Sequence, residues 1–199
     1  MMNRKLVPAL VLALAAAPAA LAQSYTIDGA HSKAQFSVRH MMVSNVRGEF
    51  TKVKGTIDYD EKNPAAIRIE ATIDVASINT GEPKRDEHLK SPDFFDVAEH
   101  PLITFRSRSA RKTANGLAVT GDLTIHGVTK EIVLQVEGPS PEVRDPWGNL
   151  RRGATAITKI NRKDFGLTWN AALETGGVVV GDEISITIDV EAMRPAAKK

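Results

Sequence analysis

The feature that most constrains this chain is a strict alternation of apolar and polar residues along several separate segments. Residues 67–75 alternate without an error, with isoleucine, alanine or valine at every second position. Residues 53–59, 117–125, 132–136 and 184–190 follow the same period. Successive side chains of a strand point to opposite faces, so each segment predicts a strand with one dry and one wet face. That is the habit of antiparallel sheets.

Turn signals join these segments into hairpins. Asn115-Gly116 and His126-Gly127 each precede a strand, and both dipeptides predict tight antiparallel turns. One stretch, residues 83–101, lacks the alternation and predicts a short helix and a loop that cover one end of the sheet. Weaker strand patterns bring the total to about eight or nine strands, near residues 25–28, 34–41, 103–111 and 153–160.

An all-β chain of this kind can bury its apolar faces in two ways. Two sheets can stack as a sandwich with a solid core, or one sheet can close into a barrel. Small residues at inward positions favour unfilled space inside, and these are Gly55, Ala71, Gly121, Ala154 and Ala156. The composition does not choose between the two architectures.

The N-terminus has the pattern of a cleaved signal peptide. Arg4 and Lys5 precede an uncharged apolar run over residues 6–19, and Ala20-Leu21-Ala22 provides a small-x-small cleavage motif before Gln23. A membrane anchor is the alternative, but the apolar stretch is about 17 residues, at the short limit for a span. We therefore expect a signal peptide over residues 1–22, a single domain over 23–194 and a frayed tail over 195–199.

Charge and cysteine content exclude several classes of function. The whole chain has a net charge of +2, and Arg4 and Lys5 account for all of it, so the region from Gln23 onward is neutral and predicts no nucleic-acid partner. The chain has no cysteine, which rules out disulfides, thiolate-ligated metals and thiol nucleophiles. Export, the absence of a lipidated cysteine and the cleavage motif together predict a periplasmic protein without a stable membrane anchor.

Catalytic and metal-binding patterns are missing from the sequence. The five histidines show no spacing typical of a preformed metal site, and no nucleophile elbow is present. We expect no catalytic residue, no metal and no cofactor. Apolar residues outside the alternation are more informative. Met41, Phe94, Phe95, Phe165 and Trp169 suit either ordinary packing or the mouth and lid of an apolar cavity.

Taken together, short blocks spread over the chain make it resemble the YceI family of periplasmic lipid-binding proteins. Their order and spacing carry the resemblance, since each block alone is weak. The blocks are residues 25–28 (YTID), His31-Ser32, 36–40 (FSVRH), 46–50 (VRGEF), 85–89 (RDEHL), 94–96 (FFD), 101–105 (PLITF), 121–129 (GDLTIHGVT) and 161–167 (NRKDFGL).

The resemblance implies an eight-stranded antiparallel, lipocalin-like barrel with an apolar lumen and a short helix and loop as a lid. It also implies an amphiphilic ligand such as a polyisoprenoid chain, an isoprenoid quinone or a fatty amide, and dimers are common in the family. No catalytic residue is implied. An enzyme acting on an isoprenoid or quinone, and a stress-response protein with a filled barrel, are the alternatives.

These expectations assign residues to a ligand site. Arg39, His40 and Arg85 adjoin apolar residues and are predicted to meet a polar headgroup. The predicted lining and mouth residues are Phe36, Val38, Met41, Ile57, Ile69, Ile73, Phe94, Phe95, Phe105, Leu123, Ile125, Phe165, Trp169 and Ile186.

Overall fold

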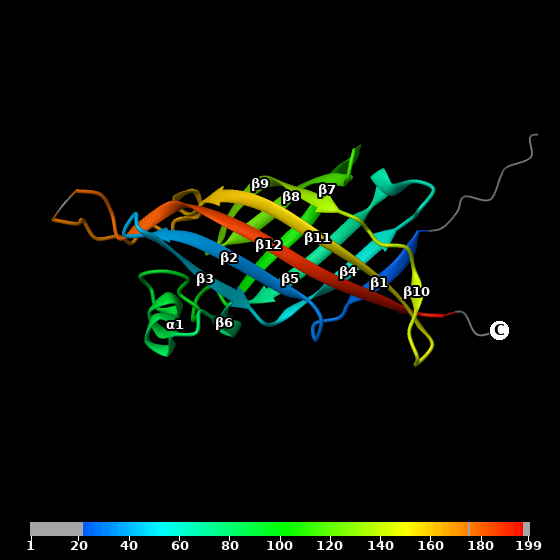
Figure 1. Cartoon of the computed structure of the whole chain (residues 1–199), viewed down its shortest axis with the longest axis horizontal. Helices are drawn as coiled ribbons and strands as arrows, with labels where there is room; N and C mark the ends of the chain where they lie inside the picture. Colours follow the sequence, from blue (N-terminus) through cyan, green and yellow to red (C-terminus); the bar gives the residue numbers. More distant parts are fainter. Residues whose placement is uncertain (1–21, 175, 197–199) are drawn as a thin grey trace, which may run out of the picture.

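The computed structural model describes residues 22–174 and 176–196, and nearly all of their regular structure is β-strand (Figure 1). The expected signal peptide up to residue 21, and residues 197–199 of the expected tail, lie outside the described residues. The strands are β1 (Gln23–Ile27), β2 (Lys33–His40), β3 (Ser44–Phe50), β4 (Val53–Tyr59), β5 (Arg68–Asp74), β6 (Ile78–Asn79), β7 (Leu102–Thr113), β8 (Gly116–Ile125), β9 (Val128–Glu137), β10 (Val143–Arg144), β11 (Asn149–Asn161) and β12 (Val180–Pro195). The helices are α1 (Pro83–Lys90) and the short 3-10 turns η1 (Pro64–Ala66), η2 (Val75–Ser77) and η3 (Arg162–Phe165).

The strands close into one antiparallel barrel. Three staves are each made of two short strands that follow one another. Strands β1 and β2 both pair with β12, strands β4 and β3 pair with β1 and β2, and strands β5 and β6 pair with β4 and β3. Together with β7, β8, β9, β11 and β12 they make eight staves, and the pairing of β11 with β12 closes the ring. The expected eight-stranded barrel is confirmed, and the stacked sandwich is excluded.

Both expected hairpins are present. Thr113 pairs with Gly116 across the β7–β8 turn, and Ile125 pairs with Val128 across the β8–β9 turn. His126 and Gly127 both have positive φ, which is why a histidine beside a glycine occupies that turn. The strand over residues 44–50 was not expected, although Val46, Gly48 and Phe50 alternate with Arg47 and Glu49. It pairs with β2 along its whole length.

The barrel is long, and its two ends are built differently (Figure 1). Helix α1 lies beside one end, below the β2–β3 hairpin and the loop that precedes β12. The β9–β11 pairing covers only residues 135–137 and 155–157, and beyond it η3 contacts β9, β11 and β12. Within the described part of the chain, no helix is long and apolar enough to span a membrane.

Candidate functional site

An apolar cavity of about 250 Å³ lies inside the barrel, and almost all of its surface is formed by apolar atoms. Its walls come from most of the staves and from the segment after α1. For scale, an engineered apolar cavity of about 150 Å³ in another protein stays dry and binds benzene. The cavity can therefore accept apolar groups without leaving their surface in water.

Most of the residues predicted to line a lumen do line this cavity. Alternation accounts for those on strands, because each strand turns one side chain of every two toward the interior. Their role in binding stays a prediction. The residues so placed are Phe36, Val38, Ile57, Ile69, Ile73, Phe94, Phe95, Phe105, Leu123, Ile125 and Ile186.

Three predicted lining residues lie elsewhere. Met41 is exposed in the β2–β3 turn, where a positive φ takes it out of the alternation. Phe165 is only 1% exposed and packs in the core where η3 fills the space between strands. Trp169 contacts the lid from outside, with its ring 5.1 Å from that of Phe94. None of the three lines the cavity.

The three predicted headgroup residues do not reach the cavity either. Arg39 is exposed and donates to the backbone oxygen of Met42. His40 lies at the end of β2, where Val180 is its partner on β12. Arg85 donates to both the side chain and the backbone oxygen of Thr80, and so holds the start of α1. Their contact with a polar headgroup stays a prediction.

The lid is held by aromatic contacts on two sides. Inside, the Phe95 ring meets the Phe50 ring edge-on at 5.7 Å, and Phe50 in turn lies 5.8 Å from Phe36. Outside, His88 of α1 lies edge-on to Phe94 and to Trp169, at 5.1 and 5.0 Å. Such pairs prefer these tilted and edge-on geometries. The segment after α1 is therefore a packed cover for this end of the cavity.

Sequence reasoning missed Arg162, a buried arginine beside the cavity. Its guanidinium donates to the backbone oxygens of Leu167, Trp169 and Gly181, and it is only 3% exposed. Burial lowers its pKa from the usual value, while Asp182 acts in the opposite direction. The arginine thus ties the residues after η3 to the start of β12. The period-two register of β11 could have found it, since Arg162 continues the inward series of Ala156, Thr158 and Ile160.

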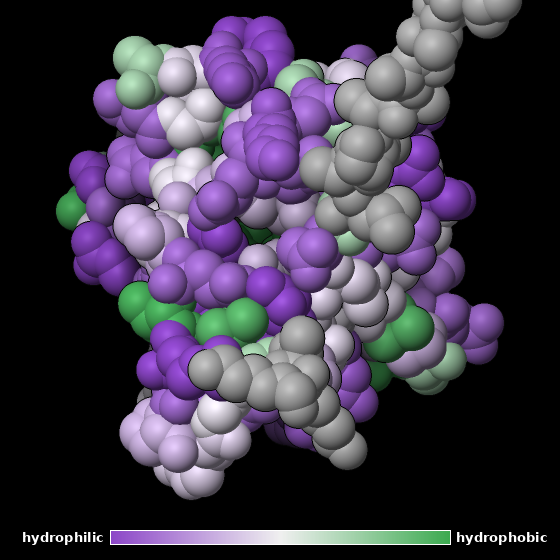
Figure 2. All heavy atoms as spheres, turned by 90° about the vertical axis from the view of Figure 1, so that its right-hand side faces the viewer, coloured by the Kyte–Doolittle hydropathy of each residue, from purple (hydrophilic) through white to green (hydrophobic). Residues whose placement is uncertain are grey.

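A layer of polar side chains lies at the other end of the barrel. Arg152 donates to the Tyr25 hydroxyl at 3.0 Å and pairs with Glu61. The Tyr25 hydroxyl donates to Glu142 at 2.6 Å, and Arg194 also pairs with Glu142. Hydrophilic residues cover most of this end of the molecule in Figure 2. The cavity therefore extends between an aromatic lid at one end and a polar layer at the other.

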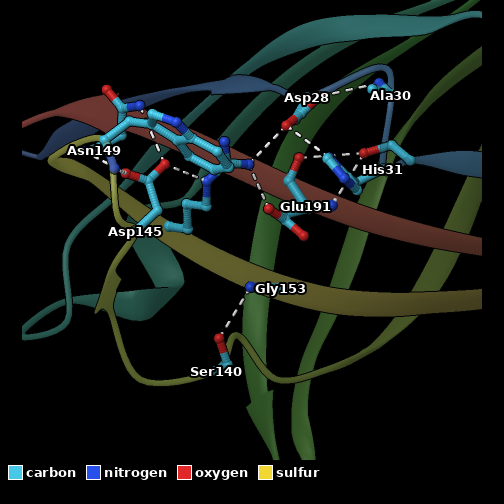
Figure 3. Close-up of polar contacts among 11 residues, drawn as sticks. Asp28, Ala30, His31, Ser140, Asp145, Asn149, Gly153 and Glu191 are labelled. Atoms are coloured by element: carbon cyan, nitrogen blue, oxygen red, sulfur yellow. Dashed lines mark hydrogen bonds and ion pairs between the residues drawn. The ribbon is translucent and has the colours of Figure 1, made fainter.

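A second polar cluster surrounds Arg151 beside this layer (Figure 3). Arg151 pairs with Asp28, Asp145 and Glu191, which lie on the β1–β2 loop, the β10–β11 turn and β12. Its hydrogen bond, followed by that of His31, lowers the pKa of Asp28 to about 2. Burial raises the pKa of Asp145, but donation from Arg151 and from the Asn149 amide outweighs it and holds that pKa at about 2.

The same cluster includes three side chains that are close enough together to bind a metal ion. Ligand atoms of Asp28, His31 and Glu191 lie within 4.8 Å of one another. The Arg151 guanidinium already pairs with both carboxylates, so a cation would have to compete with it. The expected lack of a metal stays a prediction.

Only some of the small inward residues leave space inside the barrel. Ala71, Ala154 and Ala156 line the cavity. At Gly121 the space is taken by the Phe105 ring, whose Cζ would lie 2.5 Å from an added Cβ. A glycine on the inner face can therefore mark an aromatic ring packed across the strand as well as a void.

Comparison with known proteins points to one family. The model of the YceI-like domain matches residues 25–192. Protein YceI of Escherichia coli O17:K52:H18 is 38% identical over 180 residues, covering 89% of this chain and 91% of the relative. Protein YceI of Salmonella newport is 37% identical over 177 residues, covering 88% and 89%.

Solved structures agree on the fold. Burkholderia cenocepacia BcnA is 25% identical with a TM-score of 0.70, over 83% of this chain and 98% of that one. The Campylobacter jejuni YceI protein is 33% identical with a TM-score of 0.66, over 79% and 90%. A polyisoprenoid binding domain from Saccharophagus degradans, implicated in plant cell wall breakdown, is 20% identical with a TM-score of 0.64, over 88% and 100%.

Proposed function

Because the chain belongs to the YceI-like domain family, we propose that it binds the apolar chain of an amphiphilic, isoprenoid-type lipid inside its barrel. The enclosed apolar cavity is the observation that carries this proposal. Moving apolar surface from water into such a site is favourable by about 25 cal/mol per Å². The structural neighbour described as a polyisoprenoid binding domain supports the same ligand class. A polyprenyl chain, an isoprenoid quinone and a fatty amide all present such a chain.

The make-up of the cavity wall supports binding rather than catalysis. Acid–base or nucleophilic chemistry needs ionisable groups that converge on the reacting atoms. Among the described residues that line the cavity there is no histidine, aspartate or glutamate. Arg162 and Arg152 do line it, but their hydrogen bonds are made to protein groups. An enzyme acting on an isoprenoid is therefore the weaker proposal, and a filled barrel does not fit the cavity.

The cellular role that we propose is that of a periplasmic carrier. The pattern of a signal peptide followed by a neutral chain supports export without a fixed membrane anchor. A carrier of this kind needs no cofactor beyond its lipid ligand, and a homodimer is compatible with it. A stress-response role would be a use of the same binding activity.

Filling the cavity tests the proposal. Ala156 lines the cavity, whereas its neighbour Ile157 is 42% exposed on the outer face. We expect Ala156→Phe to abolish lipid copurification, because the added ring occupies the space that the ligand needs, while Ile157→Phe keeps it. The measurement is native mass spectrometry of protein purified from the periplasm, followed by organic extraction and lipid analysis.

Two results would count against lipid binding. One is the absence of copurified lipid from the unaltered protein in repeated preparations. The other is equal lipid content in the Ala156→Phe and Ile157→Phe variants, which would place any bound lipid outside the barrel. Thermal unfolding of both variants checks that each is folded before the comparison is made.

A further inference from the structure

The end of the barrel that contains the lid also has an exposed apolar tip. It is formed by Met41, Met42 and Val43 of the β2–β3 turn and by Val178 of the loop before β12, which are 44%, 56%, 75% and 36% exposed. The two segments are joined, because the Met41 amide donates to the Val179 oxygen at 2.8 Å. Figure 1 shows the turn and the loop projecting together at this end. We call these four residues the apolar tip.

The backbone of the turn does not explain its residues. The Val43 amide closes the turn on the His40 oxygen, and both central residues, Met41 and Met42, have positive φ. Glycine, asparagine and aspartate are the residues that this geometry favours. The tight β8–β9 turn, which also has positive φ at both central residues, uses His126-Gly127. Two exposed methionines in this conformation neither favour the turn geometry nor pack in the core.

Positive charge lies directly behind the tip. Arg39 and Arg47 are exposed on β2 and β3, and neither forms an ion pair with a carboxylate of the described residues. They lie two residue pairs apart in register, since Arg39 pairs with Asn45 and Ser37 pairs with Arg47. An apolar edge backed by unpaired arginines matches the chemistry of an anionic membrane surface, with acyl chains below and phosphates above. The neighbouring carboxylates are Glu174, exposed in the loop before β12, and Asp182 and Glu183 at the start of β12, which pair with Lys163 and Lys159.

The tip adjoins the cavity. Val38 and Val180 line the cavity, and the strands that carry them lead into the turn and the loop of the tip. A ligand with an apolar chain resides in a bilayer until a protein removes it, so contact at this end would place the cavity next to its source.

We propose that the apolar tip docks this protein onto the surface of an anionic phospholipid bilayer. The ligand-transfer part of this inference rests on the proposed lipid binding, but docking itself does not. A second copy of the chain suits the tip less well. A stable dimer buries about 800 Å² on each partner, whereas the tip presents four side chains, and a two-fold contact would bring Arg39 and Arg47 of both copies together.

Vesicle binding tests the tip directly. We expect the unaltered protein to bind vesicles of phosphatidylcholine and phosphatidylglycerol, and to bind less as salt rises or as phosphatidylglycerol is removed. Met42→Ser combined with Val43→Ser should weaken binding about tenfold, through loss of buried apolar surface. Arg39→Gln combined with Arg47→Gln should remove the dependence on phosphatidylglycerol. Flotation of protein with vesicles in a density gradient measures all three.

A matched control lies at the opposite end of the barrel. Val143 and Trp147, on the β10–β11 hairpin, are 59% and 80% exposed. Val143→Ser combined with Trp147→Ser should leave vesicle binding unchanged. Because the chain has no cysteine, Val43→Cys and Asn115→Cys accept one fluorophore each. Only the label at position 43 should shift to a shorter emission wavelength when vesicles are added.

The outcomes separate docking from ligand binding. Equal vesicle binding by the tip variant and the opposite-end variant would overturn the proposal, as would an unaltered protein that binds no vesicles. A dimer in analytical ultracentrifugation that dissociates in the tip variant would instead assign the tip to self-association. Lipid copurification tests the cavity separately, since Ala156→Phe should dock normally without ligand and the tip variant should retain its lipid.

Discussion

The first half of strand β8 and strand β12 have the same alternating pattern but surround different kinds of interior. On β8, Leu117 and Val119 are 2% and 0% exposed, and neither lines the cavity. On β12, Ile184, Ile186 and Ile188 also point inward, yet they are only partly buried and all line the cavity. Residue type and period are the same, so they do not decide the difference. Leu117 and Val119 pack against other side chains, while the inward isoleucines of β12 face the cavity.

The comparison predicts different costs for truncation on the two strands. Leu117→Ala should lower the free energy of unfolding by about 2–5 kcal/mol, because it opens a cavity in a packed region. Ile186→Ala should lower it by only about 1 kcal/mol in the lipid-free protein, since the lost methyl groups already lack neighbours on the cavity side. Urea unfolding of lipid-free proteins measures both values. Equal losses would show that the β12 wall is packed after all.

Arg162 joins the residues after η3 to the start of β12, and a substitution there tests how much this connection stabilises the fold and the lid. Arg162→Met should destabilise the protein by about 3 kcal/mol, because the backbone oxygens of Leu167, Trp169 and Gly181 lose a charged donor in a buried site. The lid should loosen too, since Trp169 contacts Phe94 and His88. Hydrogen exchange should then quicken over α1 and residues 91–101. If exchange there is unchanged while the stability falls, the Arg162 hydrogen bonds stabilise the fold without holding the lid.

The Arg151 cluster gives the smallest effect, and one that depends on pH. The pKa values of Asp28 and Asp145 are lowered to about 2 in the folded protein. Carboxyl groups with lowered pKa values stabilise the fold above their unfolded pKa, near 3.9, and the contribution is lost as pH falls through about 2. Arg151→Gln should therefore lower the stability slightly at pH 7 and progressively less in acid.

Urea titrations of both proteins from neutral pH down to acid would check this expectation. The stabilities of the unaltered protein and Arg151→Gln should converge as the carboxyl groups become protonated. A constant difference across that range would contradict the ionic origin of the effect and point to packing of the arginine side chain.

Local pattern was enough to predict most of the barrel wall. Alternation over residues 53–59, 67–75, 117–125, 132–136 and 184–190 identified strands, and the two dipeptide turns identified their hairpins. These features depend on neighbours one or two residues apart. Residues 44–50 are a strand that was missed although Val46, Gly48 and Phe50 alternate with Arg47 and Glu49, because the run is short and a glycine takes one of its apolar positions.

The site could be predicted only in part. Inward strand positions such as Ile57, Ile69 and Ile186 follow from period two, and all line the cavity. Period two also places Arg152 on the inner face of β11 and Arg162, the first residue of η3, in continuation of that face, although charged residues there are easily taken for solvent-facing ones. Arg39, His40 and Arg85 do not line the cavity, and their contact with a headgroup stays a prediction.

The sequence by itself determined the strands, their buried faces, their hairpins and the apolar character of the interior, because each depends on residues close together in the chain. Only the tertiary structure decided that the sheet closes, that its interior is hollow beside β12 and packed around Leu117 and Val119, and that the apolar tip lies next to the lid. These properties depend on how volumes from distant strands add up and on where long-range pairing brings separate loops together. No local pattern contains that information.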